Sequence, residues 1–438
     1  MNEDRVARGL LALLAVVHTA VLQWLYADFV SPLFAYQGML LQKLPSYLIA
    51  WQFVFALLPT PWLPVAIRKP SEFQALLLYV VVYLPSVVVG YHICRTNEWG
   101  AYSGYLALSA ILLAIIAQVS RLPALRIPDL SVAPLHAAVL LAAFSAGVYA
   151  ALLVYYGLPD NIFDVADIYL SRADFKEKVL NAPLILGYLY FWQGIVINPM
   201  IMIAGVLKRS VALLAIGVAL QYLLFAITTL RSVALAIPFS IFMAYFFRRR
   251  IRWNGLAFCG LMTSAMTAGG IAMAGSGVAA IAGALFVQRW LTMQGQLSGA
   301  YLDYFVNRAK VFYGAGALHG LVPYFYGSMS PGQVIGDNYV SFGRLPVDNA
   351  PANFWADAFA QAGFVGMIWA TLVACVLLWL TDSVFRDLPR GMGVMLFASC
   401  ALTLTEQGVE TCILTGGWLP LMVIGVLAYK WIDRVARA

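Results

Sequence analysis

Two stretches of the chain place cations in the middle of an apolar helix face. In residues 159–183, a period of 3.6 residues brings Arg172 and Lys176 onto one face. The apolar members of that face are Val165, Ile168, Tyr169, Phe175 and Val179. In residues 301–313 the same period places Arg308 among aromatic side chains, namely Tyr301, Tyr304, Phe305 and Phe312. Since arginine is always charged and can bind phosphate through two hydrogen bonds, both stretches favour a ligand with an apolar tail and a phosphate head.

A structural role is the alternative for each of these cations, because long basic side chains can lie along apolar surface and reach lipid phosphates. Arg231 is a third cation of interest, since it is the only charged residue between Arg209 and Arg248. It either anchors a tight turn at the membrane surface or points into a central cavity. Arg289 and Arg344 are further candidates for the same phosphate-binding role.

Acid–base chemistry has few candidates. His319 follows Arg308 by eleven residues and is the histidine best placed to titrate near neutral pH, although a loop histidine can also be purely structural. Glu406 and Glu410 are four residues apart beside an apolar boundary. Either they serve as a general base, or they form ion pairs with an arginine from another helix. Asp357 is expected to stabilise the first turn of a helix.

No motif for a metal or a phosphate-binding glycine-rich loop is present, so no cofactor and no metal site are predicted. The five cysteines lie in or beside apolar segments and are expected to be small buried residues without disulfides. If the protein is an enzyme, its arginines would supply the positive charge that a metal ion could otherwise provide.

The composition identifies the elements that must position these residues. Hydrophobic residues make up 62% of the 438 and charged residues only 11%, whereas soluble domains are about one quarter charged. Apolar runs of membrane-spanning length recur along the whole chain, which predicts an all-α polytopic membrane protein. The net charge of +7 does not indicate nucleic acid, because no basic stripe lies on a polar scaffold. The N-terminal apolar run lacks a cleavage site and predicts a retained first helix.

Hydropathy predicts about twelve spans in one transmembrane domain, residues 1–438. The spans are 9–27, 46–67, 72–92, 101–119, 133–157, 184–207, 210–229, 232–247, 254–284, 353–380, 392–406 and 411–431. With the N-terminus in the cytoplasm, 17 of the 27 basic residues fall on cytoplasmic connections and ten on the other side. The positive-inside rule therefore predicts that both termini are cytoplasmic.

Two long segments then lie outside the cytoplasm, at 158–183 and 285–352. Loops of such length in a compact protein are usually functional or disordered, and these are rich in Tyr, Phe, Leu and Gly. Ordered loops with amphipathic helices are therefore expected. The sequence shows no internal repeat, and nothing like the inverted repeat with broken helices that is typical of many transporters.

The stretch from Asn349 to Gly366 reads NAPANFWADAFAQAGFVG, a polar exit from a long loop followed by an aromatic helix start and a Gly-Phe-x-Gly element. Together with the order of Arg172, Arg231 and Arg308 along the chain, and with Glu406-Gln407, this resembles the O-antigen polymerase (Wzy) family. The resemblance covers about residues 160–415.

The resemblance implies a GT-C type glycosyltransferase of the bacterial inner membrane. It would polymerise oligosaccharide repeat units linked to undecaprenyl diphosphate at the periplasmic face, without metal, for O-antigen or a related surface polysaccharide. Arg172, Lys176, Arg231, Arg289 and Arg308 would bind the diphosphate, and His319 or Glu406 would be the base.

Tyr304, Asn353 and Trp355 would contact the glycan, and a Wzz-like chain-length regulator is a possible partner. An O-antigen ligase would have a similar bundle and donor, with lipid A–core as acceptor. A flippase or other transporter of lipid-linked oligosaccharide would instead have charges inside its helices and short external loops. A scaffold without catalysis would have no need of cations on apolar faces.

Overall fold

The structure is a computed structural model that describes residues 2–157, 175, 178–179, 182–316, 318–340, 349–389 and 391–437. All regular secondary structure in these residues is helical. The first helices are α1 (Asn2–Leu25), α2 (Ser31–Phe34), α3 (Ser46–Leu57), α4 (Pro70–Leu78), α5 (Leu84–Ile93), α6 (Trp99–Gln118) and α7 (Pro134–Tyr156). The middle of the chain forms α9 (Leu184–Trp192), α10 (Asn198–Leu207), α11 (Val211–Thr228), α12 (Arg231–Arg248), α13 (Asn254–Met273), α14 (Gly277–Phe286) and α15 (Met293–Phe305). The last are α16 (Pro331–Ile335), α17 (Phe354–Val384), α18 (Met392–Thr403), α19 (Val409–Leu414), α20 (Trp418–Leu427) and α21 (Tyr429–Ala436).

Nine helical segments in the described part of the chain are long and apolar enough to cross a membrane. They are Glu3–Gln37, Pro70–Ile93, Thr96–Arg121, Pro134–Tyr156, Leu184–Leu207, Val211–Thr228, Asn254–Met273, Phe354–Val384 and Val409–Leu427. Three shorter apolar helices, Ser46–Leu57, Ser232–Arg248 and Met392–Thr403, fall on the remaining predicted spans. The protein is therefore an all-helical polytopic membrane protein.

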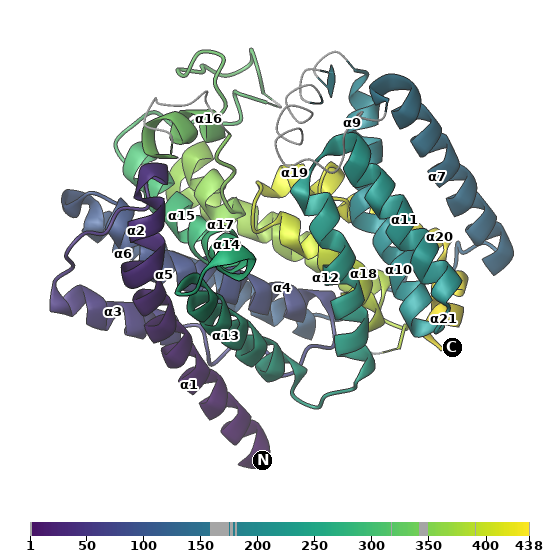
Figure 1. Ribbon diagram of the computed structural model, residues 1–438, viewed down its shortest axis with the longest axis horizontal. Coiled ribbons are helices and arrows are strands. Elements are labelled where there is room, and N and C mark those ends of the chain that lie inside the picture. The colour runs from purple at the N-terminus through teal and green to yellow at the C-terminus, as the bar shows by residue number, and fades with distance from the viewer. Residues whose placement is uncertain are drawn as a thin grey trace.

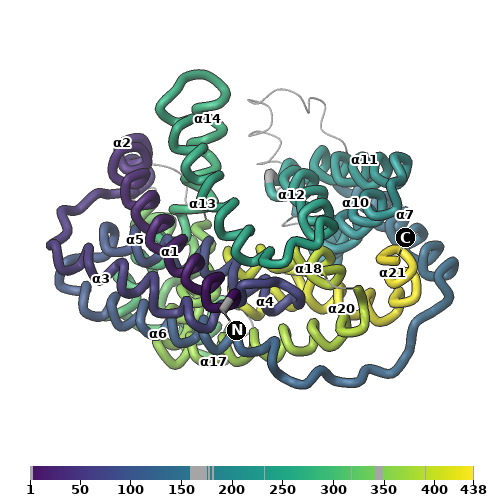
Figure 2. The backbone as a smooth tube through the Cα atoms, turned by 90° about the horizontal axis from the view of Figure 1, so that it is seen from below, coloured from purple at the N-terminus to yellow at the C-terminus, as the bar shows by residue number. Residues whose placement is uncertain are grey.

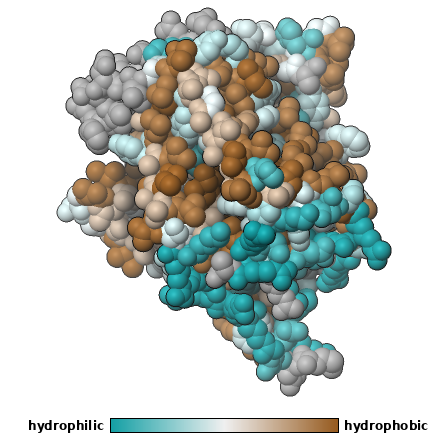
Figure 3. All heavy atoms as spheres, turned by 90° about the vertical axis from the view of Figure 1, so that its right-hand side faces the viewer, coloured by the Kyte–Doolittle hydropathy of each residue, from teal (hydrophilic) through white to brown (hydrophobic). Residues whose placement is uncertain are grey.

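The helices form two groups joined by α17 and α18 (Figure 1). Helices α1 to α6 pack with α13 and α15, while α7 and α9 to α12 form the other group. Helix α18 contacts both α4 and α12, so it links the groups directly. Large apolar side chains on α7, such as Leu135, Val139 and Val154, are more than half exposed. Figure 3, which views the molecule from the right-hand side of Figure 1, shows a broad apolar surface above a polar region.

The chain reverses direction where the sequence predicts one long span at 254–284. Helix α13 ends at Met273, and after Gly277, which has a φ of +74°, α14 packs back along α13. Figure 2 shows this helical hairpin projecting from the body. A π-helical turn, Val287–Thr292, then leads into α15. The first part of the predicted loop 285–352 is thus a helix, and irregular structure begins only after Phe305.

Helix α15 lies deep in the molecule, with every residue from Gln294 to Phe305 buried. Two small residues one helical turn apart allow its close approach to α5, because a Cβ on Gly299 would lie 2.6 Å from the Gly90 carbonyl oxygen. A Cβ on Gly295 would overlap the carbonyl of Pro85. Buried glutamines lower the hydropathy of this helix, which explains why the sequence predicts a loop here.

Candidate active site

Helix α17 is broken inside its apolar stretch. Ala362 (φ −148°, ψ 26°) and Gly363 (φ 64°, ψ −147°) leave the helical conformation, and the glycine makes this positive φ accessible. Residues 311–313, which follow α15 and are called the capping segment below, satisfy the carbonyl groups beside the break. Val311 N donates to Ala360 O at 3.0 Å, and Phe312 N donates to Gln361 O at 3.0 Å. The predicted span 353–380 is therefore present as Phe354–Val384, but with a break in its helix at Ala362 and Gly363. Non-helical backbone at such a position is tolerated where it is covered by protein or lines a cavity.

The capping segment is itself strained. Phe312 and Tyr313 have φ values of 47° and 60°, which are unusual for side chains of this size. Tyr313 N donates to the Gln361 side-chain oxygen at 2.7 Å, so the broken helix holds the strained turn in place. Such outliers cost about 1–3 kcal/mol each and concentrate at functional sites. The break and the strained turn together mark this end of α17 as a candidate site.

Two carboxyl groups meet beside this turn. Asp357, in the first turn of α17, lies within hydrogen-bonding reach of Glu410 in α19, and it also accepts a hydrogen bond from Gln361. Gly408 lies against both, because a Cβ there would be 2.5 Å from Glu410 Oε1 and 2.6 Å from Asp357 Oδ2. Two carboxyl groups this close must share a proton between them. The sequence predicts a helix-stabilising role for Asp357 but does not reveal its pairing with Glu410.

The Tyr313 ring belongs to the same cluster. Burial, together with the negative charges of Glu410 and Asp357, raises the pKa of Tyr313 to about 12. The hydroxyl therefore stays protonated at neutral pH and can act as a hydrogen-bond donor. A backbone hydrogen bond from Phe354 N to Leu404 O, 3.3 Å long, holds the start of α17 against the connection between α18 and α19. This contact fixes the position of the carboxyl cluster.

Glu406 lies in that same connection, where the charge of a cation from a distant part of the chain acts on it. The residue as a whole is exposed, but protein atoms around its carboxyl group partly desolvate that group and so raise its pKa. The positive charge of Arg289 acts in the opposite direction and lowers the pKa of Glu406. The π-helical turn between α14 and α15 carries Arg289, which also contacts Met293 Sδ at 3.8 Å. The structure thus brings together one predicted base and one predicted phosphate-binding cation.

Arg308 and Tyr304 form a second predicted pair. The Arg308 guanidinium carbon lies 3.9 Å from the centre of the Tyr304 ring, a cation–π contact that leaves the arginine exposed. Arg308 lies beyond the end of α15, so it does not share the predicted helix face with Tyr304 and Phe312. Tyr326 and Tyr339 pack around Tyr304, with ring centres 6.2 and 6.4 Å away. An aromatic platform therefore supports the cation.

A buried carboxylate anchors this platform. Asp303, which is 2% exposed, accepts a hydrogen bond from Arg95 N at 2.9 Å. Arg95 Nε donates to both oxygens of the same carboxylate, each at 3.0 Å. The Tyr339 hydroxyl donates to the same carboxylate at 2.5 Å. Arg95 is thus used in fixing the end of α15 against the α5–α6 connection.

Lys310 is a site residue that sequence reasoning misses. Its ammonium group donates to Phe305 O and lies 4.5 Å from the centre of the Phe359 ring. Burial lowers the pKa of Lys310. The side chain connects the end of α15 to the first half of α17, beside Gly363. No sequence pattern distinguishes it from an exposed lysine, because its burial depends on the break in α17.

The predicted glycan contacts of Asn353 and Trp355 are not compatible with their positions, since the two side chains are 0% and 1% exposed. The Asn353 side chain caps α17 by accepting from Trp355 N and Ala356 N, both at 3.2 Å, and donates to Ser298 Oγ at 2.9 Å. Trp355 Nε1 donates to Thr371 Oγ1 at 3.0 Å. Both residues are therefore structural, and a folded helix leaves a sugar no access to them.

His319 does not join the carboxyl cluster through any contact within the described residues. It is exposed, and its Nδ1 lies 3.2 Å from the carbonyl oxygen of Gly314. Glu406 is thus the better supported of the two predicted bases, because the positive charge of Arg289 acts on its carboxyl group.

Several predicted cations lie beyond what the structure describes. Arg172, Lys176 and Arg344 are outside the described residues. The backbone of Arg231 begins α12, but its side chain is outside the described part. On the predicted apolar face of 159–183, Phe175 is buried between the rings of Tyr156 and Tyr190.

No group of three or more metal-binding side chains occurs among the described residues. In Glu406 and Arg289 the site has a proton acceptor and a fixed positive charge that acts on it. Comparison of the chain with family models, with curated proteins and with solved structures finds no match.

Proposed function

We propose that this protein is an inner-membrane glycosyltransferase that polymerises oligosaccharide repeat units carried on undecaprenyl diphosphate. The observation that carries the proposal is the effect of the positive charge of Arg289 on the Glu406 carboxyl group, whose pKa burial raises. The resemblance of residues 349–366 to O-antigen polymerases supplies the substrate class. In this proposal both termini are cytoplasmic, the bundle has about twelve spans, and the site opens to the periplasm.

The chemistry divides between these two residues. Glu406 takes the proton from the acceptor hydroxyl as its oxygen bonds to the anomeric carbon of the donor. The bond from that carbon to the diphosphate breaks, and the electron pair leaves with the diphosphate oxygen. Arg289 offsets the negative charge that develops on this leaving group. Since a raised pKa makes Glu406 a stronger base than an ordinary carboxylate, burial favours its role.

Arg308 would bind the diphosphate of the second lipid-linked substrate. Its exposed guanidinium lies on the Tyr304 ring, so the ring orients the cation while phosphate can still approach it. In the proposal Tyr304 also contacts the glycan at its edge. Arg172, Lys176 and Arg231 are proposed for the same phosphate-binding role, and a chain-length regulator remains a proposed protein partner.

The test uses purified protein in detergent with a lipid-linked repeat unit and no added metal, read as a glycan ladder on a gel. Arg289→Ala should abolish the ladder or reduce it about 100-fold, since each electrostatic contact to a developing charge contributes about 3 kcal/mol. Arg437→Ala is a matched control, because that exposed arginine pairs with Asp433 at the C-terminal helix. A ladder unaffected by Arg289→Ala would contradict the proposed site. Transfer only after addition of lipid A–core would indicate a ligase.

A transporter of lipid-linked oligosaccharide is the second candidate, and one observation favours it. Broken membrane helices often form the binding sites of transporters, and α17 is broken beside the Asp357–Glu410 pair. Reconstituted vesicles distinguish the two functions. Movement of the lipid-linked unit across the bilayer, without a ladder, would support the transporter and exclude the polymerase.

A further inference from the structure

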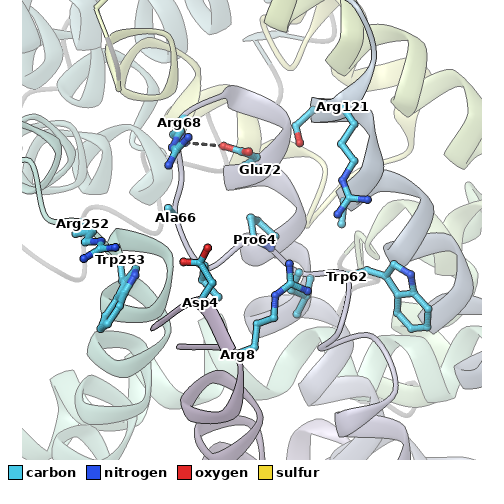
Figure 4. A pocket seen from close by; sticks show the side chains of 14 residues that line it. Asp4, Arg8, Trp62, Pro64, Ala66, Arg68, Glu72, Arg121, Arg252 and Trp253 are labelled. Atoms are coloured by element: carbon cyan, nitrogen blue, oxygen red, sulfur yellow. Dashed lines mark hydrogen bonds between the residues drawn. The ribbon is translucent and has the colours of Figure 1, made fainter. Parts of the chain in front are cut away.

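A pocket at the opposite end of the molecule gathers four connections that are far apart in sequence. It has a volume of about 360 Å³ and is formed by the start of α1, the α3–α4 connection, the end of α6 and the α12–α13 connection. Its polar lining includes Arg8, Arg68, Arg121 and Arg252, with Asp4 and Glu72 as the acidic members. Figure 4 shows these side chains arranged around the pocket. The lining therefore carries a net charge of +2, from four basic and two acidic residues.

The acidic residue Glu72 does not neutralise the arginine side chains. Its carboxylate accepts hydrogen bonds from the backbone N–H groups of Arg68, at 2.6 Å, and Lys69, at 3.1 Å, in a box that caps α4. Figure 4 marks the bond between Arg68 and Glu72. The capping fixes the backbone at Arg68 and leaves its guanidinium free to face the pocket.

The four arginines differ in what they bind. Arg252 pairs with Glu3 at 2.5 Å, and Arg8 donates to the carbonyl of Pro61. The guanidinium groups of Arg68 and Arg121 have no hydrogen-bond or ion-pair partner among the described residues, and both side chains are exposed. These two cations lie on opposite sides of one pocket, so a single anion can bind both of them.

We propose that this pocket binds a phosphate group, and that the phosphate belongs to the headgroup of an anionic phospholipid. Guanidinium groups match phosphate oxygens through paired hydrogen bonds, and a pocket of this size can hold a headgroup. The positive-inside rule explains why arginines are frequent at this end, but it does not require that they converge on one pocket.

The surroundings favour lipid over a soluble phosphate. Trp62 lines the pocket and is 46% exposed, and tryptophan side chains are enriched at the depth of lipid headgroups. Leu10 and Leu13, which follow Arg8 on α1, are 41% and 58% exposed and offer apolar surface to acyl chains. A phospholipid could thus place its phosphate in the pocket and its chains along α1. Basic pockets between membrane helices are known to bind such headgroups.

Native mass spectrometry of the full-length protein in detergent, titrated with phosphatidylglycerol or phosphatidylcholine, tests the proposal. We expect wild type to prefer phosphatidylglycerol. The double variant Arg68→Gln/Arg121→Gln should lose affinity for it by about 10-fold or more, because a charge-assisted phosphate contact is lost at each position. The matched control, Arg386→Gln/Arg437→Gln, removes two arginines that already pair with Asp387 and Asp433, and it should change affinity by less than about twofold.

A titration with inorganic phosphate distinguishes a lipid headgroup from a soluble phosphate as the ligand of the pocket. Saturable stabilisation by inorganic phosphate, without preference between the two lipids, would overturn the assignment to lipid. Equal affinity of the double variant and the control would overturn the pocket as the binding site. If the double variant does not fold, the single variant Arg121→Gln takes its place, since that exposed side chain has no partner to lose.

Discussion

Asp357 and Glu410 press their carboxyl groups against the same residue, Gly408, whose missing side chain leaves room for both. The two acids come from α17 and α19, which are adjacent only because the chain folds the α18–α19 connection onto the start of α17. Their contact requires a shared proton and connects the broken helix to the segment that carries Glu406. This pair is therefore the structural centre of the site that we propose.

The carboxyl pair predicts a difference between two substitutions of one residue. Asp357→Asn keeps a hydrogen-bonding group toward Glu410 and should change the free energy of unfolding by less than about 1 kcal/mol. Asp357→Ala leaves Glu410 without its partner and should cost about 1–3 kcal/mol. Thermal unfolding in detergent, followed by the fluorescence of the buried tryptophans, measures both. Equal stability of the two variants would show that the pair contributes nothing.

The charge of Arg289 predicts a shift in the pH dependence of the reaction. Glu406 must be ionised to accept a proton, so activity should rise with pH through its pKa, which burial raises above the ordinary glutamate value. Arg289 favours the ionised form. Arg289→Gln should therefore move the acid limb of the profile of kcat/KM against pH to higher pH, besides lowering the rate.

The control for this profile is Arg437→Gln, which should leave the acid limb in place. If the acid limb does not shift in Arg289→Gln, the charge of Arg289 does not act on the base, which would contradict the prediction. The folded state gives an independent check. Because a raised pKa means that ionisation of Glu406 destabilises the fold, stability should decline as pH rises from the ordinary glutamate pKa to the raised one. Glu406→Gln should reduce this decline, because one of the carboxyl groups that contribute to it is removed.

The platform of Arg308 predicts an effect on substrate affinity. Arg308→Ala should raise KM for the lipid-linked substrate about 10-fold or more, because a charge-assisted contact to phosphate is lost. Tyr304→Phe retains the ring and should behave like wild type, whereas Tyr304→Leu removes the cation–π contact and should raise KM less than Arg308→Ala does. Initial rates over a range of substrate concentrations measure the effect. A normal KM in Arg308→Ala would rule out this residue as a phosphate contact.

The close approach of α15 to α5 predicts a stability effect far from the site. Gly295→Ala adds a methyl group where the Pro85 carbonyl already lies, so unfolding should become easier by about 1–3 kcal/mol. Gly147→Ala in α7 is the matched control, since a Cβ there meets nothing within 4 Å. The melting temperature should fall in Gly295→Ala and rise in Gly147→Ala, because alanine is more favourable than glycine at an open helical position. A stable Gly295→Ala variant would contradict the packing.

The apolar segments could be predicted from the sequence because hydropathy over about 20 residues is a local signal. Glu406 could be recognised as a candidate for a related reason, since a carboxylate beside an apolar boundary is costly and therefore noticeable. Of the two roles considered for Glu406, the structure bears on the interaction with an arginine, because Arg289 acts on it across the fold, and the role of base stays a prediction.

The remaining features depend on tertiary contacts. Helix α15 carries Gln294, Gln296 and Ser298, which reduce its hydropathy, and only its burial against other helices shows that it belongs to the bundle. The break in α17 is stabilised by hydrogen bonds from Val311 and Phe312, which are about fifty residues away along the chain. Asn353 and Trp355 resemble binding residues by type, but their partners Ser298 and Thr371 make them structural.

The most direct test of the central claim is the glycan ladder formed by Glu406→Gln protein from a lipid-linked repeat unit without metal. The substitution keeps the shape and removes the base, so we predict that the ladder is lost while the protein remains folded and elutes like wild type. Asp387→Asn, which removes an exposed carboxylate paired with Arg386, should leave the ladder intact. A full ladder from Glu406→Gln would contradict the assignment of Glu406 as the base.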